Sequence, residues 1–291
     1  RGAAAESGGR VRVRLAFSTN AFVRFTIEEA CGRIARAGYR GVEILADAPH
    51  AYPSREYREI AAALRGTLDE LHLEVSNVNA NTMFGFWRDP PPEPFFEPSL
   101  ISERLEFRQA RLEAICMVLN FAARIGARNI SITTGKPLGA MSPAACEPVL
   151  EDMLGQVLNR AENLGINVGL ECEPGLLIES TDELLAWISR MNSPRLGANL
   201  DIGHAIVSGE DPCQAIRKLQ GRIWNLHLED IRGRKHYHLI PGEGDVHFEA
   251  VAMTLREVGY DRWATVELYT QSGDPDRAAA ASLRVLGPLF E

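Results

Sequence analysis

The sequence predicts an α/β fold, a closed (β/α)8 barrel, because strand and helix signals alternate through eight pairs along its 291 residues. One type of junction recurs: four predicted helices end in a glycine that an apolar strand follows within a few residues. These glycines are Gly38, Gly126, Gly165 and Gly259. Such junctions imply parallel strands with right-handed crossovers, and eight units favour closure into a barrel.

Four strand–helix pairs are predicted in the first half of the chain. Strands are expected at residues 11–18, 41–45, 74–79 and 129–133, with helices at 26–37, 57–71, 102–125 and 142–164. Thr26 is a suitable cap for the first helix. Residues 80–100 form the longest irregular stretch and contain five prolines, and a loop of this length is typically functional or disordered.

The second half supplies four more pairs, and each strand ends beside a potential metal ligand. Short apolar runs lead into Glu171, Asp201, His227 and Glu267, and helices are expected at 181–191, 212–220, 248–258 and 274–289. The C-terminal strand ends of a closed barrel carry the active site, so these four side chains should converge. The segment FSTNAF after the first strand lacks the glycines of a dinucleotide-binding fingerprint, which disfavours that fold.

Length, net charge and cysteine content limit the classes of protein to which this chain can belong. The length fits a single barrel domain over residues 11–291, and the small, polar residues 1–10 are expected to be a disordered tail or an expression remnant. The net charge of −8 argues against a polyanionic partner such as nucleic acid. Five scattered cysteines suggest reduced thiols and a cytoplasmic location. No apolar run reaches the length that a membrane span requires.

Glu171, Asp201, His227 and Glu267 form an oxygen-rich ligand set. Such a set suits Mn²⁺, Mg²⁺ or Co²⁺ better than a structural zinc, so we expect one divalent ion, Mn²⁺ first, with Mg²⁺, Co²⁺ or Zn²⁺ as alternatives. The ion could polarise a substrate carbonyl and stabilise an enediolate, while a neighbouring carboxylate removes the adjacent proton. A single glutamate after a strand is more often a surface residue, but four potential ligands in the same register on four successive strands lower those odds.

Six motifs resemble the xylose isomerase-like barrel superfamily, which includes sugar phosphate isomerases and epimerases, dehydratases and endonuclease IV. The motifs are GVEIL, VGLECEPG, NLDIGHA, NLHLED, HYHLIPGEGDVHF and TVELY. The resemblance implies a xylose isomerase-like TIM barrel in which the four residues bind one divalent metal. It also implies that His204 touches substrate and that Glu171 and Glu267 form the catalytic acid–base pair.

Three departures from the family patterns limit this resemblance. Ketose 3-epimerases carry a second carboxylate six residues after the first metal-binding glutamate, where this chain has Leu177. Their substrate-contacting arginine corresponds to Gly233, which Arg232 and Arg234 flank. Endonuclease IV needs extra histidines on the third and fourth strands, but SNVNAN and ITTGKP contain none. A free ketohexose substrate and a nuclease are therefore both disfavoured.

Further residues are candidate substrate contacts. Glu173 lies on the same strand face as Glu171, because strand side chains alternate with period two, and it is the alternative ligand. His236 and His238 alternate after the seventh strand; they either contact substrate oxygens or a second ion, or lie in an exposed polar loop. Candidate contacts also include Arg232 and His50.

Together these observations predict a metal-dependent isomerase or epimerase that moves a proton next to a carbonyl of a sugar or sugar derivative through an enediolate. A lyase or dehydratase is the alternative, because the same enediolate can expel a β-hydroxyl. A non-catalytic metabolite-binding barrel and an endonuclease IV-like nuclease represent other classes. The expected partner is a small sugar or polyol, and neither nucleic acid nor a membrane is expected as a partner. A homo-oligomer is possible.

Overall fold

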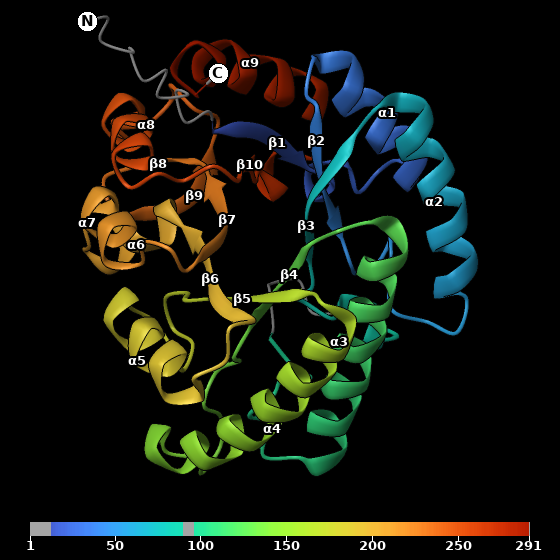
Figure 1. Cartoon of the computed structure of the whole chain (residues 1–291), viewed down its shortest axis with the longest axis vertical. Helices are drawn as coiled ribbons and strands as arrows, with labels where there is room; N and C mark the ends of the chain where they lie inside the picture. Colours follow the sequence, from blue (N-terminus) through green and yellow to red (C-terminus); the bar gives the residue numbers. More distant parts are fainter. Residues whose placement is uncertain (1–12, 90–95, 291) are drawn as a thin grey trace, which may run out of the picture.

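Eight parallel strands close into a barrel in this computed structural model, which describes residues 13–89 and 96–290. The strands are β1 (Arg14–Ser18), β2 (Gly41–Leu45), β3 (Glu74–Asn79), β4 (Asn129–Thr133), β5 (Asn167–Glu171), β6 (Leu196–Asp201), β7 (Ile223–Leu228) and β10 (Trp263–Val266). Each strand pairs with its predecessor in this series, and β1 pairs with β10 to complete the ring (Figure 1). The predicted (β/α)8 barrel is thus confirmed. The tail expected at residues 1–10 lies outside the described residues.

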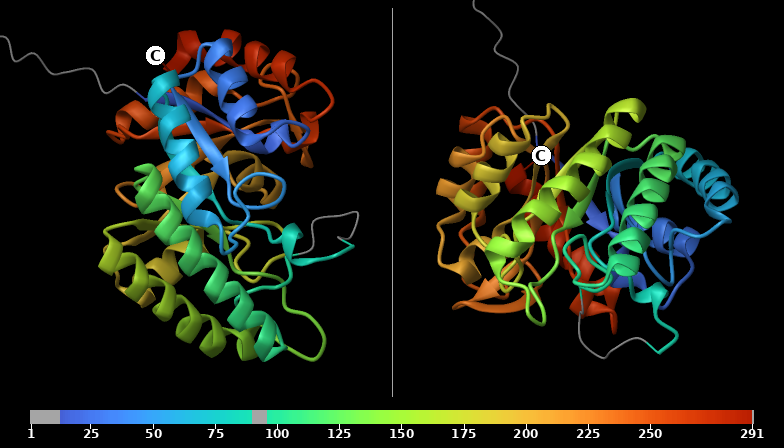
Figure 2. Two further views of the ribbon diagram at one scale, coloured as in Figure 1. Left: turned by 90° about the vertical axis from the view of Figure 1, so that its right-hand side faces the viewer. Right: turned by 90° about the horizontal axis from the view of Figure 1, so that it is seen from below.

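Helices surround the barrel on its outer side (Figure 1). They are α1 (Ile27–Ala37), α2 (Tyr57–Leu71), α3 (Leu105–Ile125), α4 (Pro143–Leu164), α5 (Thr181–Met191), α6 (Ile202–Ser208), α7 (Pro212–Lys218), α8 (Phe248–Glu257) and α9 (Pro275–Phe290). Figure 2 shows α2, α3 and α4 side by side along one flank. Among the described residues, no helix combines the length and the apolar character that crossing a membrane requires.

Local sequence signals account for several helix ends. Thr26 and Glu29 form a reciprocal capping box at the start of α1, which satisfies two backbone N–H groups that the helix cannot pair itself. Helices α1, α3 and α4 end at left-handed glycines, as predicted, and a fourth glycine with positive φ follows α8. Only glycine adopts this conformation without steric cost, so it turns the chain sharply towards the next strand.

Two elements after β6 and β7 differ from the sequence-based expectation. A short helix, α6, begins directly after β6, because Asp201 caps it by accepting a hydrogen bond from the His204 backbone N–H at 2.9 Å. The loop after β7 contains an antiparallel hairpin of β8 (Asp230–Arg232) and β9 (Lys235–Leu239). Gly233 has a φ of 63° in its two-residue turn. The hairpin places alternate residues of β9 on opposite faces.

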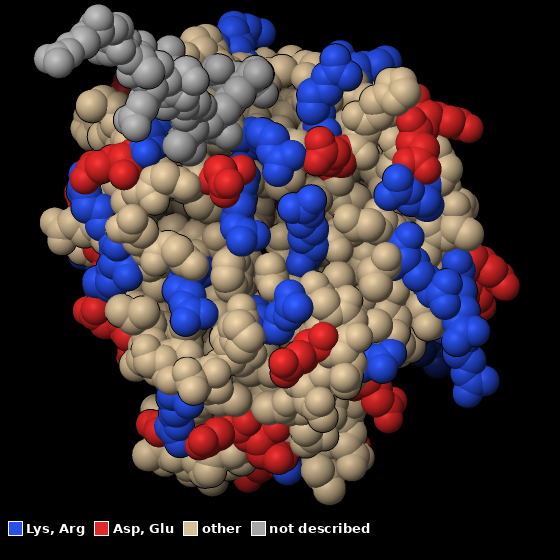
Figure 3. All heavy atoms as spheres, in the orientation of Figure 1, with Lys and Arg blue, Asp and Glu red and all other residues tan. Residues whose placement is uncertain are grey.

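The apolar core fills the space between barrel and helices, where residues such as Val42, Ile132, Leu64 and Leu119 are buried. The barrel interior near the C-terminal strand ends is polar instead. Its buried side chains include Glu43, Asn77, Asn79, Asn199, Asn225 and His227. At the surface, Lys and Arg side chains are interspersed with Asp and Glu on the face seen in Figure 3. The buried polar groups therefore mark the barrel interior at the C-terminal strand ends as the candidate site.

Candidate metal and substrate site

The four predicted ligands come together at the C-terminal ends of their strands. Glu171, Asp201, His227 and Glu267 are all buried, and each offers one ligand atom within 4.8 Å of the others. Glu171 and Asp201 end β5 and β6, and Glu267 follows β10 directly. Asp201 and His227 are paired in the register of β6 and β7. Parallel pairing in one closed barrel is what brings these distant residues to one point.

A buried carboxylate that contacts His227 determines the orientation of the imidazole ring. Nε2 of His227 lies 2.7 Å from Oε2 of Glu43, across the barrel on β2. Nδ1 then faces the three acidic ligands, at 3.5 Å from Glu267, 3.7 Å from Glu171 and 3.8 Å from Asp201. Burial would lower the pKa of His227, but the surrounding negative charges raise it well above its ordinary value. A carboxylate that holds one ring nitrogen typically orients a metal-binding histidine.

Asparagine side chains hold the two glutamates by one oxygen each. Asn20 and Asn79 each donate to Oε1 of Glu267 at 2.9 Å. Asn81 donates to Oε2 of Glu171 at 2.8 Å, and Asn199 donates to the same oxygen. An asparagine N–H can only donate, so each bond fixes the orientation of a carboxylate. The opposite oxygen of Glu267, Oε2, lies 3.5 Å from Nδ1 of His227, whereas that of Glu171, Oε1, lies 3.5 Å from Nδ1 of His204.

The group fits a divalent cation. Oδ2 of Asp201 is buried and has no hydrogen-bond partner among the described residues, which is unusual for a buried carboxylate oxygen. Burial raises the pKa of Glu267 to about 8, with the charge of Glu171 adding to the effect and His227 opposing it. A cation among these carboxylates would offset both the missing partner and the crowded negative charge. The structure thus contains a candidate site for a divalent metal, formed by three carboxylates and one imidazole.

A cavity of about 250 Å³ opens beside this group. Six of the predicted site residues line it: Glu171, Glu173, His204, His236, His238 and Glu267. Glu173 is half-buried two residues beyond the end of β5, and burial raises its pKa to about 7. Burial alone would lower the pKa of His204, but the charges of Asp201 and Glu173 outweigh burial and raise it to about 10. Several titratable groups therefore face one enclosed space.

Two other predicted contacts lie elsewhere. Arg232 lies in the hairpin, where its guanidinium donates to the backbone oxygen of Glu243. His50 is buried with its ring nitrogens 3.2 Å from Thr19 Oγ1 and 3.3 Å from the oxygen of Phe25. Neither Arg232 nor His50 is among the described residues that line the cavity.

The aromatic residues of the third loop divide between two surroundings. Phe84 lines the cavity, and its backbone N–H donates to Asp47 at 2.7 Å. Phe86 and Trp87 pack instead on Phe107 of α3, with ring centroids 5.5 and 5.7 Å away. Phe84 and Phe96 of this loop therefore border the cavity, while Phe86 and Trp87 anchor the loop to a helix.

The asparagines around the glutamates were not foreseen from the sequence, although a signal was present. Asn77, Asn79 and Asn81 follow one another with period two, and Asn199 lies two residues before Asp201. This spacing places them on the face of the strand that points into the barrel. Asparagines with period two along or just after a strand would have identified Asn79, Asn81 and Asn199, whereas Asn20 shows no such pattern.

Comparisons with known proteins agree with this architecture. Residues 31–289 match the family model described as xylose isomerase-like TIM barrel. Inosose dehydratase from Clostridium beijerinckii is 24% identical over 271 residues, which cover 83% of this chain and 82% of that protein. Fructoselysine 3-epimerase from Shigella flexneri is 25% identical over 258 residues, covering 85% and 87%. A solved structure of the IolI protein with a bound zinc atom has a TM-score of 0.75 at 16% identity, covering 96% and 100%. The chain therefore belongs to the xylose isomerase-like TIM barrel family.

Proposed function

We propose that this chain is a metal-dependent isomerase or epimerase that moves a proton next to a carbonyl in a small sugar or polyol derivative. The observation that carries the proposal is the convergence of Glu171 and Glu267, with Asp201 and His227, on one buried point beside a cavity. Relatives named for acting on inosose and on fructoselysine support a polyol substrate.

Glu171, Asp201, His227 and Glu267 would hold the metal, with Mn²⁺ as our first candidate. The likeness to an IolI protein that was solved with a zinc atom supports a divalent ion for this chain. A bound divalent ion would supply Lewis-acid polarisation of the substrate carbonyl, which acidifies the neighbouring C–H group. The oxygen-rich donor set favours Mn²⁺ over a structural zinc.

The two glutamates are suited to move the proton. Asn20 and Asn79 hold Oε1 of Glu267, so Oε2 is the atom that takes or returns a proton. Oε1 of Glu171, which lies 3.5 Å from Nδ1 of His204, has the corresponding role on the other side. Without a metal, burial raises the pKa of Glu267 to about 8, and a bound cation would lower this pKa again, so that the carboxylate could act as a base near neutral pH.

A dehydratase is the second candidate, because a third carboxyl group faces the cavity. Burial raises the pKa of Glu173 to about 7, so this carboxyl group could carry the proton that a departing hydroxyl needs to leave as water. In that reaction a base breaks the C–H bond, the C–O bond to the β-hydroxyl breaks, and the electron pair forms a carbon–carbon double bond. The match to inosose dehydratase supports this alternative.

The test is incubation of Mn²⁺-loaded protein in D₂O with ketohexoses, their phosphates and keto-inositols, followed by NMR. An isomerase or epimerase should place deuterium next to the carbonyl and form an isomer of the same composition. The exposed Glu249→Gln variant serves as control and should behave like the wild-type protein. Loss of water would favour the dehydratase. Absence of deuterium exchange across the panel would instead favour a non-catalytic binding barrel.

A further inference from the structure

Arginine recurs where the barrel strands begin. Six of the eight strands start with an arginine or directly follow one, namely Arg14, Arg40, Arg128, Arg195, Arg222 and Arg262. Parallel strands of a closed barrel all begin on one face, so these arginines gather at the N-terminal face, opposite to the candidate metal site. Figure 3 shows several Lys and Arg side chains close together over the middle of this face. The face therefore carries local positive charge on a chain whose net charge is −8.

A cavity of about 200 Å³ opens on this face. It is lined by four arginines, Arg14, Arg65, Arg128 and Arg262, and Glu74 is the only acidic residue among its described lining residues. The cavity beside the candidate metal ligands is the opposite case, because none of its described lining residues is Lys or Arg. Of the two cavities, the one at the N-terminal face therefore presents the positive charge that an anion requires.

Two of these four arginines are paired with carboxylates. Arg14 pairs with Glu74 at 2.9 Å, and Arg65 pairs with Asp69 of its own helix. Within residues 13–89 and 96–290, no carboxylate forms an ion pair with Arg128 or Arg262. Guanidinium groups that share one cavity repel one another, and a multivalent anion between them would offset this repulsion.

Tryptophan rings support two of the arginines. The guanidinium of Arg14 lies 4.2 Å from the ring centroid of Trp263, and that of Arg262 lies 4.6 Å from the ring centroid of Trp224. Such stacking orders the flat face of a guanidinium and leaves its N–H groups available to hydrogen-bond acceptors. The two side chains are therefore held in place by contacts that do not consume their donors.

Glycines of neighbouring strands make room for both rings. A Cβ atom at Gly41 would lie 2.3 Å from the ring of Trp263, and one at Gly197 would lie 2.3 Å from Nε1 of Trp224. The indole N–H of Trp224 also donates to the backbone oxygen of Arg195 at 3.0 Å. Each stacked arginine thus rests on a tryptophan whose place is fixed by the barrel itself.

We propose that the N-terminal face of the barrel binds a small phosphate-bearing anion in this cavity, between Arg14, Arg128 and Arg262. A guanidinium presents several N–H donors in one plane, and these match the oxygens of a phosphate group in pairs. The volume of about 200 Å³ lies below the range of about 300–1,000 Å³ that is typical of pockets for drug-sized ligands, so a small anion fits better than a large one. The site lies at the opposite strand ends from the candidate metal site and does not depend on the proposed reaction.

The test is a calorimetric titration of the full chain, as purified, with inorganic pyrophosphate at an ionic strength of about 0.1 M, where charges beyond about 10 Å are screened. The wild-type protein should bind one pyrophosphate per chain at the arginines. Replacing Arg128 and Arg262 together by serine should weaken the affinity about 100-fold, since a hydrogen bond to a charged group typically contributes about tenfold or more.

The matched control replaces Arg55 and Arg284 by serine. Both side chains are exposed and lie outside the cavity, so this variant loses the same charge elsewhere on the surface. Its affinity should change by less than about threefold, because distant exposed charges are screened. Pyrophosphate can also chelate a bound metal, but the heat of that reaction would be the same in all variants.

Arg128→Ser alone keeps the proposal falsifiable if the double variant fails to fold. Arg128 is exposed, so the single variant should melt like the wild-type protein in the absence of pyrophosphate and bind it about tenfold more weakly. No saturable binding by the wild-type protein, or equal weakening in the two double variants, would overturn the proposal. Tighter binding of a single-stranded oligonucleotide than of pyrophosphate through the same arginines would also overturn it, because the face would then recognise an extended polyanion.

Discussion

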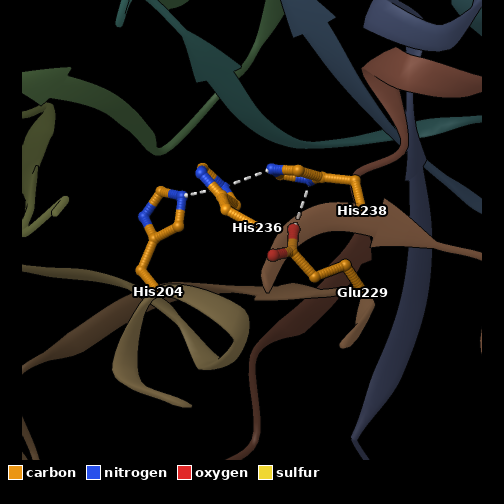
Figure 4. Close-up of side chains that lie close together, drawn as sticks. All are labelled: His204, Glu229, His236 and His238. Carbon is orange, nitrogen blue, oxygen red and sulfur yellow. Dashed lines mark hydrogen bonds and ion pairs between the residues drawn. The ribbon is translucent and has the colours of Figure 1, made fainter. Parts of the chain in front are cut away.

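Two groups of ligand-type residues face one cavity, and they differ in the atoms they offer and in the elements that carry them. The carboxylate group contains Glu171, Asp201, Glu267 and one imidazole, and it lies at the ends of four barrel strands. The histidine group contains the imidazoles of His204, His236 and His238, which lie on a short helix and a hairpin outside the barrel, together with Glu229 (Figure 4). The carboxylate group thus offers mainly oxygen donors, and the histidine group offers mainly nitrogen donors.

The two groups nevertheless share one structural feature. In each group a buried carboxylate contacts a ring nitrogen of an imidazole: Glu43 contacts His227, and Glu229 contacts His238. The carboxylate group is positioned by strand register, which a closed barrel leaves little freedom to change. The histidine group depends on the hairpin and on the cap of α6, so its geometry should respond more readily to local changes. The comparison teaches that the same contact between a carboxylate and an imidazole can be built either between barrel strands or between a strand end and a hairpin.

The largest effect is expected from Asp201→Ala, because Asp201 serves both groups. Its loss should remove the ion of the carboxylate group together with activity, and it should also release the His204 end of α6. Removing a helix cap costs about 0.5–2 kcal/mol of stability. Metal content and thermal melts measure these effects, with the exposed Asp152→Ala variant as control. An Asp201→Ala protein with full metal occupancy would contradict the ligand assignment.

Glu171→Gln and Glu267→Gln should each reduce turnover by roughly 10²- to 10⁴-fold if both residues move protons, since this is the usual contribution of a general acid or base. An epimerase needs both glutamates on opposite faces of the substrate, so each variant should block product while one-sided deuterium exchange persists. An isomerase working on one face should tolerate one of the two changes. Near-normal turnover in both metal-loaded variants would direct attention to Glu173 and the histidine group.

The smallest effects are expected from the supporting carboxylates. Glu43→Gln should weaken metal affinity by about 10- to 100-fold, the usual cost of removing a partner of a metal-binding histidine, because Glu43 contacts His227. Glu229→Gln should have little effect on metal affinity, because Glu229 contacts His238 and not His227. Competition titrations of Mn²⁺ with a chelating dye measure both variants, and equal weakening by both changes would show that the two groups act as one site.

The alternation of strand and helix signals was sufficient to predict the barrel, because period-two and helical apolar patterns are local properties of the chain. The four positions of the carboxylate group could also be proposed from sequence. Apolar runs that end in Glu171, Asp201 and Glu267 mark three strand ends, and parallel strands bring their C-terminal ends together. Local pattern and barrel topology therefore suffice for residues at strand ends.

Only the tertiary structure decided which side chains support those positions. Glu43 meets His227 across the barrel, between strands that are not neighbours, and no spacing along the chain encodes that distance. His236 and His238 meet His204 because the hairpin folds back over α6, a pairing that depends on backbone hydrogen bonds between β8 and β9. A sequence pattern reports which face of an element a side chain occupies, whereas contacts between distant elements follow from how the closed barrel packs.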